Sequence, residues 1–542
     1  MGKPWLQHYG TIPAEIDTTA NGTVLDIIEQ ASARFGDRMA YTNLGAELSF
    51  AETEALSRDF AAWLQTKLGV KKGDRIALMT PNVLAYAPIS FGIIRAGAVQ
   101  VNVNPLYSPR ELKHQLNDAD ADVIVIFNQS TPTLAQIVTE TGIKTVITLG
   151  LDDVKPRGLP TIPVDPRLSD IATPLAQVLE QGRDMPYTHP DMTQDDLIFL
   201  QYTGGTTGLS KGAQLTHGNL VSNIETLIVW FNGMVKEGEE TIITALPLYH
   251  IFALMVNLLS FYRLGASNVL ITNPRDMDAF VADWGKQPIT IFTGVNTLYV
   301  GLLHHPGFAQ IDHSALKLSF GGGAPVQKAV SDRWRGVTGI HIIEGYGLSE
   351  TGPVLTMNLM TSDDATASIG LPFPTTDIVI LDDDENEVPQ GQTGELCAKG
   401  PQIMPGYWRN EDANAKSFTK DGYFKTGDIA VMDDAGYFRI VDRKKDMILV
   451  SGFNVFPNEI EDVLAGMDGL VESACVGVPD EKTGEAVKVF CVKKDDTLSA
   501  DDVIAHCRAN LTAYKVPKQI AFIDELPKTA VGKILRRELR DR

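Results

Sequence analysis

The chain has 542 residues, of which 44% are hydrophobic and 21% charged, which is the composition of a well-packed soluble protein with at least two domains. Its formal net charge of −21 argues against non-specific binding to nucleic acid, so a polyanionic ligand must meet a local group of cations. Its four cysteines form no C-x-x-C pair, which disfavours a zinc site and is typical of reduced, buried thiols in a cytosolic protein.

The N-terminal residues MGKPWLQHYG show neither a secretory signal nor a myristoylation signal. The longest uncharged run, Leu246–Tyr262, is close to membrane-span length but contains a proline, a histidine, an asparagine and a serine. It therefore predicts a buried helix or the wall of a pocket.

Between residues 73 and 127, short β-rich segments alternate with helix-length amphipathic segments. This alternation predicts an α/β architecture, in which a parallel sheet is covered by helices. The expected strands are Arg75–Met79, Val99–Val103 and Asp122–Phe127, and the expected helices are Val83–Ala96 and Ser108–Asp118.

The segment YTGGTTGLSKG, Tyr202–Gly212, has the composition of a phosphate-binding loop. Glycines let backbone N–H groups approach an anion, hydroxyls donate further hydrogen bonds, and Lys211 adds a positive charge. The Walker A pattern fails because the lysine precedes its glycine, whereas G-x-S-x-G, typical of a hydrolase nucleophile elbow, matches at Gly208–Gly212 and stays a weak alternative beside a ligand-free loop. A strand at Leu197–Gln201 before the loop and a helix beginning near His217 favour a nucleotide site at a strand end.

Two further glycine clusters follow strand-like segments: GGGAP at Gly321–Pro325, after Leu316–Phe320, and EGYGLSETGP at Glu344–Pro353, after Ile342 and Ile343. Each alone is also compatible with a tight turn. Three such units together predict one composite ligand site, because glycine lets the backbone approach a base or a phosphate closely.

Beyond Gly427 the sequence becomes charged and rich in turns, which predicts a compact α+β unit. We expect a hairpin at Asp433–Gly436 and a domain boundary in the charge run DRKKD at Asp442–Asp446. The predicted helices are Pro457–Leu464, Ala500–Leu511 and Lys533–Arg540, and the predicted strands are Ala474–Val478 and Ala486–Val492.

Six ordered motifs resemble those of the adenylate-forming ligases, most closely the bacterial long-chain fatty-acid acyl-CoA synthetases. They are YTGGTTGLSKG, GGGAP, YGLSETGP, YFKTGD (Tyr423–Asp428), DRKKDMILVSGFNVFPNEIE (Asp442–Glu461) and PKTAVGKILRR (Pro527–Arg537). The resemblance covers nearly the whole chain, and chance agreement across six motifs in order is negligible.

The resemblance implies a large α/β N-terminal domain, 1–443, with Rossmann-like parallel sheets layered with helices and a small β-barrel-like part, followed by a small mobile α+β domain, 444–542. It also implies a two-step reaction. A carboxylate attacks the α-phosphate of ATP to give acyl-AMP and pyrophosphate, and the thiol of coenzyme A then displaces AMP. Because this chemistry needs charge neutralisation and positioning, the lack of a credible nucleophile triad agrees with it.

The resemblance assigns roles to residues of the N-terminal domain. Thr203, Gly204, Gly205, Thr206, Thr207 and Lys211 would hold the β- and γ-phosphates, and Gly323, Ala324, Glu344, Gly345 and Tyr346 would line the adenine pocket. Ser349 would lie at the α-phosphate, Glu350 would bind Mg²⁺, and Asp428 with Arg443 would bind the ribose. Taken alone, Glu350 would be read as a surface carboxylate, and Asp428 has the alternative of an exposed turn residue.

Three further residues would serve the mobile domain. Lys533 would bring a cation to the reacting oxygens, although an isolated C-terminal lysine usually faces solvent. Lys445 would be the hinge for the rotation between half-reactions, and the turn containing Gly452 would line the thiol channel.

Two residues of the expected N-terminal domain, His250 and Trp230, each have two possible roles. His250 matches a family position near the acyl pocket but could equally be a core histidine. Trp230 could gate an acyl tunnel, although packing is the commoner role of such an aromatic. Ser349 stands where relatives commonly have threonine and keeps the hydroxyl.

The region Asp152–Asp191 departs from the family pattern, because it is rich in proline and comparatively acidic where relatives often carry a basic amphipathic stretch. This disfavours a stable interfacial helix and leaves both tight membrane association and strict long-chain preference in doubt. The competing functions are ligation of a medium-chain, aromatic or other acid, and a nucleotide sensor with a decayed site. The protein is expected in the cytoplasm, with weak peripheral contact to the inner face of the cytoplasmic membrane and a homodimer left open.

Overall fold

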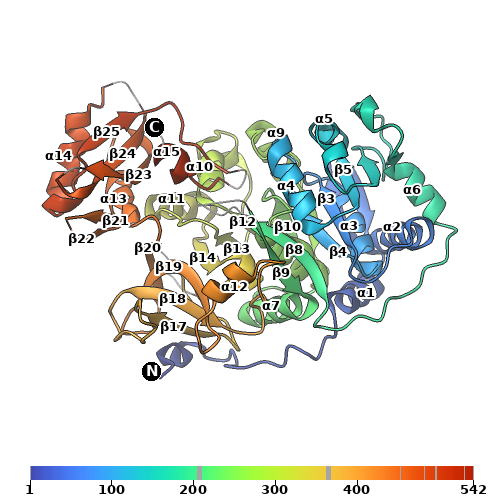
Figure 1. The fold of residues 1–542 in the computed structure, drawn as a ribbon, viewed down its shortest axis with the longest axis horizontal. Coiled ribbons are helices and arrows are strands. Elements are labelled where there is room, and N and C mark those ends of the chain that lie inside the picture. Colours follow the sequence, from blue (N-terminus) through green and yellow to red (C-terminus); the bar gives the residue numbers. More distant parts are fainter. Residues whose placement is uncertain are drawn as a thin grey trace.

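The computed structural model describes residues 2–203, 210–361, 368–451, 453–480, 482–494, 497–529, 532–540 and 542. Strands in these residues form four sheets. Figure 1 shows the helix-covered large sheets at the centre and right, and a C-terminal lobe, coloured orange to red, at the left end.

A seven-stranded sheet contains the α/β unit predicted from the sequence. Its neighbouring strands are parallel, except for an antiparallel pair at one edge. Every residue of the central Val-Ile-Val-Ile-Phe strand is buried, as expected for a parallel strand covered on both faces. In spatial order the strands are β7 (Ala172–Pro174), β6 (Thr145–Leu149), β5 (Val123–Phe127), β3 (Arg75–Met79), β4 (Val99–Asn102), β8 (Leu197–Thr203) and β9 (Lys211–Thr216).

A nine-stranded sheet carries the two later glycine clusters. Its central strands are parallel, so the carboxyl ends of β13 and β14, where the clusters begin, lie side by side. In spatial order the strands are β16 (Leu371–Pro372), β15 (Val354–Met357), β14 (Ile342–Gly347), β13 (Leu318–Gly321), β12 (Ile291–Gly294), β10 (Thr241–Thr244), β11 (Ser267–Leu270), β1 (Met39–Asn43) and β2 (Ala46–Ser49).

Helices cover these two sheets, and several begin at side-chain caps visible in the sequence. The hydroxyls of Ser108 and Thr216, for example, accept hydrogen bonds from the third helical N–H of α4 and α7. The helices are α1 (Val24–Phe35), α2 (Phe50–Trp63), α3 (Tyr86–Arg95), α4 (Pro109–Ala119), α5 (Thr131–Ala135), α6 (Leu175–Gly182), α7 (His217–Trp230), α8 (Phe261–Arg263), α9 (Met277–Trp284), α10 (Asn296–His304), α11 (Lys328–Thr338) and α12 (Glu411–Ser417).

The uncharged run is buried, as predicted. It contains a π-helix, η6 (Ala253–Ser260), in which all eight residues are buried, followed directly by α8. Across the described residues, no helix has the length and apolarity needed to cross a membrane. The proline-rich region does form one short helix, α6, but its apolar residues Leu175, Val178 and Leu179 are buried where it packs against α2.

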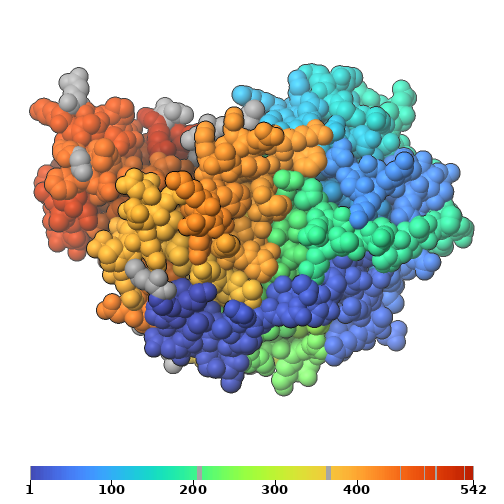
Figure 2. Space-filling view, turned by 60° about the horizontal axis from the view of Figure 1, so that its bottom comes forward, coloured from blue at the N-terminus to red at the C-terminus, as the bar shows by residue number. Residues whose placement is uncertain are grey.

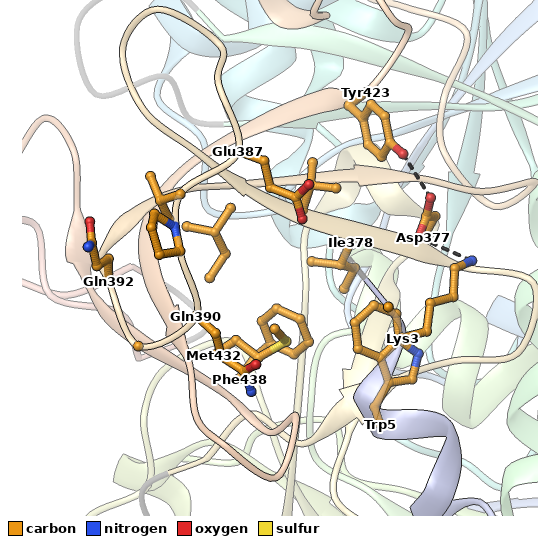
Figure 3. A pocket seen from close by; sticks show the side chains of 16 residues that line it. Lys3, Trp5, Asp377, Ile378, Glu387, Gln390, Gln392, Tyr423, Met432 and Phe438 are labelled. Carbon is orange, nitrogen blue, oxygen red and sulfur yellow. Dashed lines mark hydrogen bonds and ion pairs between the residues drawn. The ribbon is translucent and has the colours of Figure 1, made fainter.

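A four-stranded antiparallel sheet follows at the place of the predicted small β-barrel-like part, and its described strands pair in an open order instead of a closed barrel. It consists of β17 (Asp377–Leu381), β18 (Gly394–Lys399), β19 (Phe424–Met432) and β20 (Phe438–Arg443), and the predicted turn at Asp433–Gly436 joins the last two. The N-terminal segment, dark blue in Figure 2, lies on the surface beside this part of the chain. Its Trp5 packs on Phe438, and Figure 3 shows both lining a cavity of about 170 Å³ between the segment and the sheet.

The C-terminal unit has its own hydrophobic core, built from residues between Ile448 and Leu539. All four cysteines of the chain are free and buried, as predicted. The strands of this unit are β21 (Ile448–Val450), β22 (Phe453–Val455), β23 (Leu470–Asp480), β24 (Gly484–Lys493) and β25 (Gln519–Phe522), and the helices are α13 (Pro457–Ala465), α14 (Ala500–Asn510) and α15 (Arg536–Arg540). The boundary between 443 and 444 stays a prediction.

The helix predicted from Lys533 to Arg540 is shorter, because α15 begins only at Arg536. Lys533 instead belongs to a turn in which its carbonyl accepts a hydrogen bond from the Thr529 N–H. Gly532, at φ +77°, has the left-handed backbone that glycine adopts readily in such a turn.

Candidate functional site

The carboxylate of Asp428 is the centre of a buried polar group. Asp428 is 4% exposed, and strand pairing places it opposite Arg443, whose Nε lies 3.3 Å from Asp428 Oδ1. The Tyr346 hydroxyl, from β14, donates to Asp428 Oδ2 at 2.7 Å. Three motifs distant in sequence therefore meet at one carboxylate, and Asp428 is not the exposed turn residue that its sequence context also allowed.

Lys533, from the C-terminal unit, interacts electrostatically with this group. Burial and the positive charges of Arg443 and Lys445 together lower the pKa of its ammonium group to about 7, although Asp428 opposes them. The preceding residue, Gly532, contacts α10 of the N-terminal part so closely that a Cβ there would overlap Thr297 Oγ1. The glycine thus allows the lysine to enter the site.

Glu350 is buried, at 7% exposure, and is not a surface carboxylate. The Tyr407 hydroxyl donates to its Oε1 at 2.7 Å, and the Tyr407 ring centroid lies 4.2 Å from Lys211 Nζ. Burial, together with the Glu350 charge, raises the pKa of the Tyr407 hydroxyl, so it stays a donor. The sequence analysis did not identify Tyr407, because a tyrosine in the segment Pro-Gly-Tyr-Trp matches no motif for a metal or nucleotide site.

The GGGAP cluster and β14 form the predicted adenine side of the site. Gly323 has φ +76° and only Val295 near its Cβ position, so backbone is exposed to open space there, next to Ala324. Glu344 Oε2 accepts a hydrogen bond from the Val326 N–H at 3.1 Å, tying the loop to β14. Burial and the negative charge of Asp462 in α13 together raise the pKa of Glu344 to about 8, although the Val326 N–H opposes them.

Gly345 follows Glu344 on β14 and lies against Met357 of the neighbouring β15. Ser349 and Glu350 belong to a short 3₁₀ turn, η8 (Ser349–Thr351), that follows β14. All the predicted residues of this motif are therefore carried by one strand and the turn after it.

The predicted phosphate loop joins two antiparallel strands, β8 and β9, in which Thr203 is the partner of Lys211. This differs from the expected passage from a strand to a helix, because β9 lies between the loop and α7. Gly204, Gly205, Thr206 and Thr207 lie outside the described residues. At the base of the loop, Tyr202 donates to Asp118 at 2.5 Å and the Gly212 carbonyl accepts from the Trp408 N–H.

His250 lies close enough to Lys533 for the two charges to interact. Burial lowers the pKa of its imidazole to about 4, and Lys533 contributes to the shift. Its Nδ1 accepts a hydrogen bond from the Phe252 N–H at 3.4 Å, so the neutral ring carries its proton on Nε2. His250 is thus a neutral donor beside the site.

Trp230 is fully buried and its indole N–H donates to the Asn358 carbonyl at 3.2 Å. It packs edge-on against Tyr9 and tilted against Phe373. These contacts fit the packing interpretation of this residue.

The residues on either side of Lys445 form ion pairs with different parts of the protein. Lys444 pairs with Asp383 and Glu395 of the four-stranded part, whereas Asp446 pairs with Arg536 and Arg540 of the C-terminal unit. Lys445 itself is exposed. The predicted hinge therefore lies where side-chain partners change from one unit to the other.

The predicted turn at the thiol channel lies between β21 and β22, where Val450 pairs with Phe453. Ser451 there has φ +52°. Gly452 lies outside the described residues.

Two protein-family models match the chain: "AMP-binding enzyme" over residues 28–408 and "AMP-binding enzyme C-terminal domain" over residues 459–533. The chain therefore belongs to the AMP-binding enzymes, the adenylate-forming family that its motifs resemble. This confirms the fold and family predicted from the sequence.

Individual proteins of this family are similar to the chain over its full length. The chain is 50% identical to a long-chain-fatty-acid–CoA ligase of Escherichia coli O6:H1, over 100% of this chain and 98% of that protein. It is 46% identical to a long-chain-fatty-acid–CoA ligase of Haemophilus influenzae, with the same coverage. Among solved structures it resembles ATP-bound MatB from Rhodopseudomonas palustris, with TM-score 0.84 and 29% identity, covering 96% of this chain and 98% of that one.

Proposed function

We propose that this protein is an ATP-dependent fatty-acid–CoA ligase that forms acyl-CoA, AMP and pyrophosphate through an acyl-AMP intermediate. The observation that carries the proposal is the meeting of Asp428, Tyr346 and Arg443 from three motifs, with Lys533 of the C-terminal unit near enough for its charge to interact with theirs. The full-length similarity to long-chain-fatty-acid–CoA ligases supports the choice of acid.

In the first half-reaction, an oxygen of the fatty-acid carboxylate attacks the α-phosphorus of ATP, and the bond to pyrophosphate breaks. Both reactants are anions, so the barrier falls when cations neutralise their oxygens in a desolvated site. Protonated Lys533 supplies one such charge and Lys211 supplies another at the departing phosphates. Asp428 accepts hydrogen bonds from the ribose hydroxyls, which orients the nucleotide.

The residues at Glu350 fit a magnesium ion. Mg²⁺ in nucleotide sites usually takes one or two carboxylates together with substrate phosphates, and Glu350 offers a buried carboxylate of which Oε1 accepts from Tyr407. The described residues hold no cluster of three or more potential ligands that would bind a metal without the nucleotide. When bound, the ion would neutralise phosphate charge, and Tyr407 would keep Glu350 in place for it.

In the second half-reaction, the sulfur of coenzyme A attacks the acyl carbonyl of acyl-AMP and AMP departs, while the thiol proton is lost. We propose that the unit 444–542 rotates about Lys445 between the two steps, withdrawing Lys533 and presenting the Ser451–Phe453 turn. The division of ion pairs on either side of Lys445 supports this hinge.

We also propose that the protein acts in the cytoplasm and reaches the inner face of the cytoplasmic membrane through peripheral contact alone. The burial of the apolar residues of α6 against α2 supports weak contact, because that helix offers no free apolar face to lipid. A homodimer stays a prediction.

The test is coenzyme A-dependent AMP release by the purified protein across acids from acetate to oleate, with benzoate included. The proposal expects a maximum with medium or long chains. A maximum with benzoate would keep the mechanism and overturn the substrate. Absence of AMP with every acid would overturn the enzymatic function.

A further inference from the structure

A row of buried amide side chains runs along β4, passes to the neighbouring strand β8 and ends at the Tyr249 carbonyl, next to His250 in the chain. Gln100 Nε2 donates to Asn102 Oδ1 at 2.6 Å, and Asn102 Nδ2 donates to Gln201 Oε1 at 2.9 Å. Gln201 Nε2 then donates to the Tyr249 carbonyl at 3.1 Å. None of the three amide residues is more than 4% exposed, so no solvent competes with these bonds.

The last bond of this row joins two parts of the candidate site. Gln201 lies on β8, two residues before Thr203, where the phosphate loop begins. The Tyr249 carbonyl belongs to the peptide group that leads into His250. Gln201 therefore links the strand of the phosphate loop to the backbone that carries the histidine.

The same backbone segment is held a second time. Asn82 Nδ2 donates to the Leu246 carbonyl at 2.9 Å, and Asn82 Oδ1 accepts from the Leu248 N–H at 2.8 Å. Asn82 fixes the start of the segment, whereas Gln201 fixes its end at Tyr249. The His250 N–H and carbonyl are held by Pro247 and Leu254, and the contact from Gln201 holds the peptide group between Tyr249 and His250 from outside the segment.

An amide is the side chain that fits position 201. It must accept from Asn102 and donate to the Tyr249 carbonyl at the same time, which a carboxylate or an apolar side chain cannot do. Without the donor, the Tyr249 carbonyl loses a buried hydrogen bond, and the segment gains by moving to find another.

We propose that Gln201 is a positioning residue for adenylation: it holds the Tyr249 carbonyl and so fixes the backbone from which the His250 side chain extends. The part of this inference that concerns catalysis rests on the proposed function. The part that concerns the orientation of His250 does not.

The first test observes His250 directly, by NMR of the protein with ¹³C-labelled histidine, assigned with His250→Ala. We expect Gln201→Met to move the His250 signal and to leave the other assigned histidines unchanged. The matched control is Asn268→Leu, because Asn268 is also buried, at 2% exposure, and its amide donates to a backbone carbonyl, that of Asn257, at 3.1 Å, outside the row of amides. A His250 signal that is unmoved in Gln201→Met, or moved equally in the control, would overturn the inference.

A second variant tests the donor itself. Gln201→Glu keeps an acceptor for Asn102 but donates to Tyr249 only when its carboxyl is protonated. Its His250 signal should therefore return toward that of the wild type, compared at equal pH, as the pH falls. A difference from wild type that does not change with pH would count against the hydrogen bond as the cause. If Gln201→Met does not fold, Gln201→Glu takes its place in the first test.

The third test uses pyrophosphate exchange in a double-mutant cycle. Gln201→Met should lower the exchange rate about tenfold, the size expected for a lost buried hydrogen bond, and should add little to the loss caused by His250→Ala. Independent, multiplying losses would show that Gln201 acts only through stability. If the wild type exchanges no pyrophosphate, the proposed function fails, and the NMR result still decides the orientation of His250.

Discussion

Replacing Tyr407 by Phe should impair adenylation by loosening Glu350. The change deletes only the hydroxyl that donates to Glu350 Oε1 at 2.7 Å, and it keeps an aromatic ring beside Lys211. Glu350 and Tyr407 are 7% and 6% exposed, so water cannot readily replace the lost donor. The carboxylate is then free to turn away from the position where it would meet the metal and the phosphates.

The size of the effect follows from the burial of this pair. A hydrogen bond to a charged group contributes about 1.5–3 kcal/mol, which corresponds to a loss of about 10- to 150-fold in kcat/KM if the reaction needs the bond intact. Losing a partner of a metal ligand typically weakens metal binding by about 10- to 100-fold. We therefore expect the Mg²⁺ concentration for half-maximal activity to rise by a similar factor.

The assay is ATP–pyrophosphate exchange with fatty acid, measured over a series of Mg²⁺ concentrations. Tyr423→Phe is a matched control, because the Tyr423 hydroxyl also donates to a carboxylate, that of Asp377, at 2.7 Å but lines the cavity by the N-terminal segment. Equal Mg²⁺ dependence in Tyr407→Phe, Tyr423→Phe and wild type would refute the reasoning, since it would mean that Glu350 needs no support.

Three further outcomes follow from Lys533 and Glu344. Lys533→Ala should abolish pyrophosphate exchange while thioester formation from supplied acyl-AMP largely persists, and equal loss of both steps would contradict the hinge. Because the Lys533 pKa in the free protein is about 7, its charged form declines as pH rises through 7, so kcat/KM for adenylation should fall above this pH, and Lys533→Arg should remove this dependence if it is active. Folding raises the Glu344 pKa to about 8, so this group stabilises the fold below its unfolded pKa and loses that contribution as the pH rises toward 8. Glu344→Gln should therefore lessen the fall in the free energy of unfolding between pH 5 and pH 8, measured with urea.

Local sequence signals gave the α/β elements correctly. The strand Arg75–Met79 has the predicted bounds, and the apolar run of β5 is buried throughout. Such segments are predictable because their side-chain periodicity and caps act over a few residues. The helix at Lys533 was predicted too long because its sequence has a helical composition. In the structure its first residues form a turn instead, and that turn depends on contacts of Thr529 and Gly532.

Motifs also identified most of the residues that meet at the site, since glycines, hydroxyls and charges in a fixed order report the chemistry of a nucleotide. They did not reveal Tyr407, which supports Glu350, or Gln201, which contacts Tyr249. Tyr407 lies outside the six motifs, and Gln201 ends a predicted strand just before one of them. Their partners lie 57 and 48 positions away in the sequence, so no local pattern reports the contacts.

The sequence by itself determined the family, the order of the elements and the chemical groups available for the reaction, because these depend on residue type and short-range spacing. Only the tertiary structure decided the environment of those groups. Burial and neighbouring charges lower the pKa of Lys533 to about 7 and that of His250 to about 4. Desolvation and Coulomb interactions act through space, between atoms that chain folding brings together, so no local pattern encodes them.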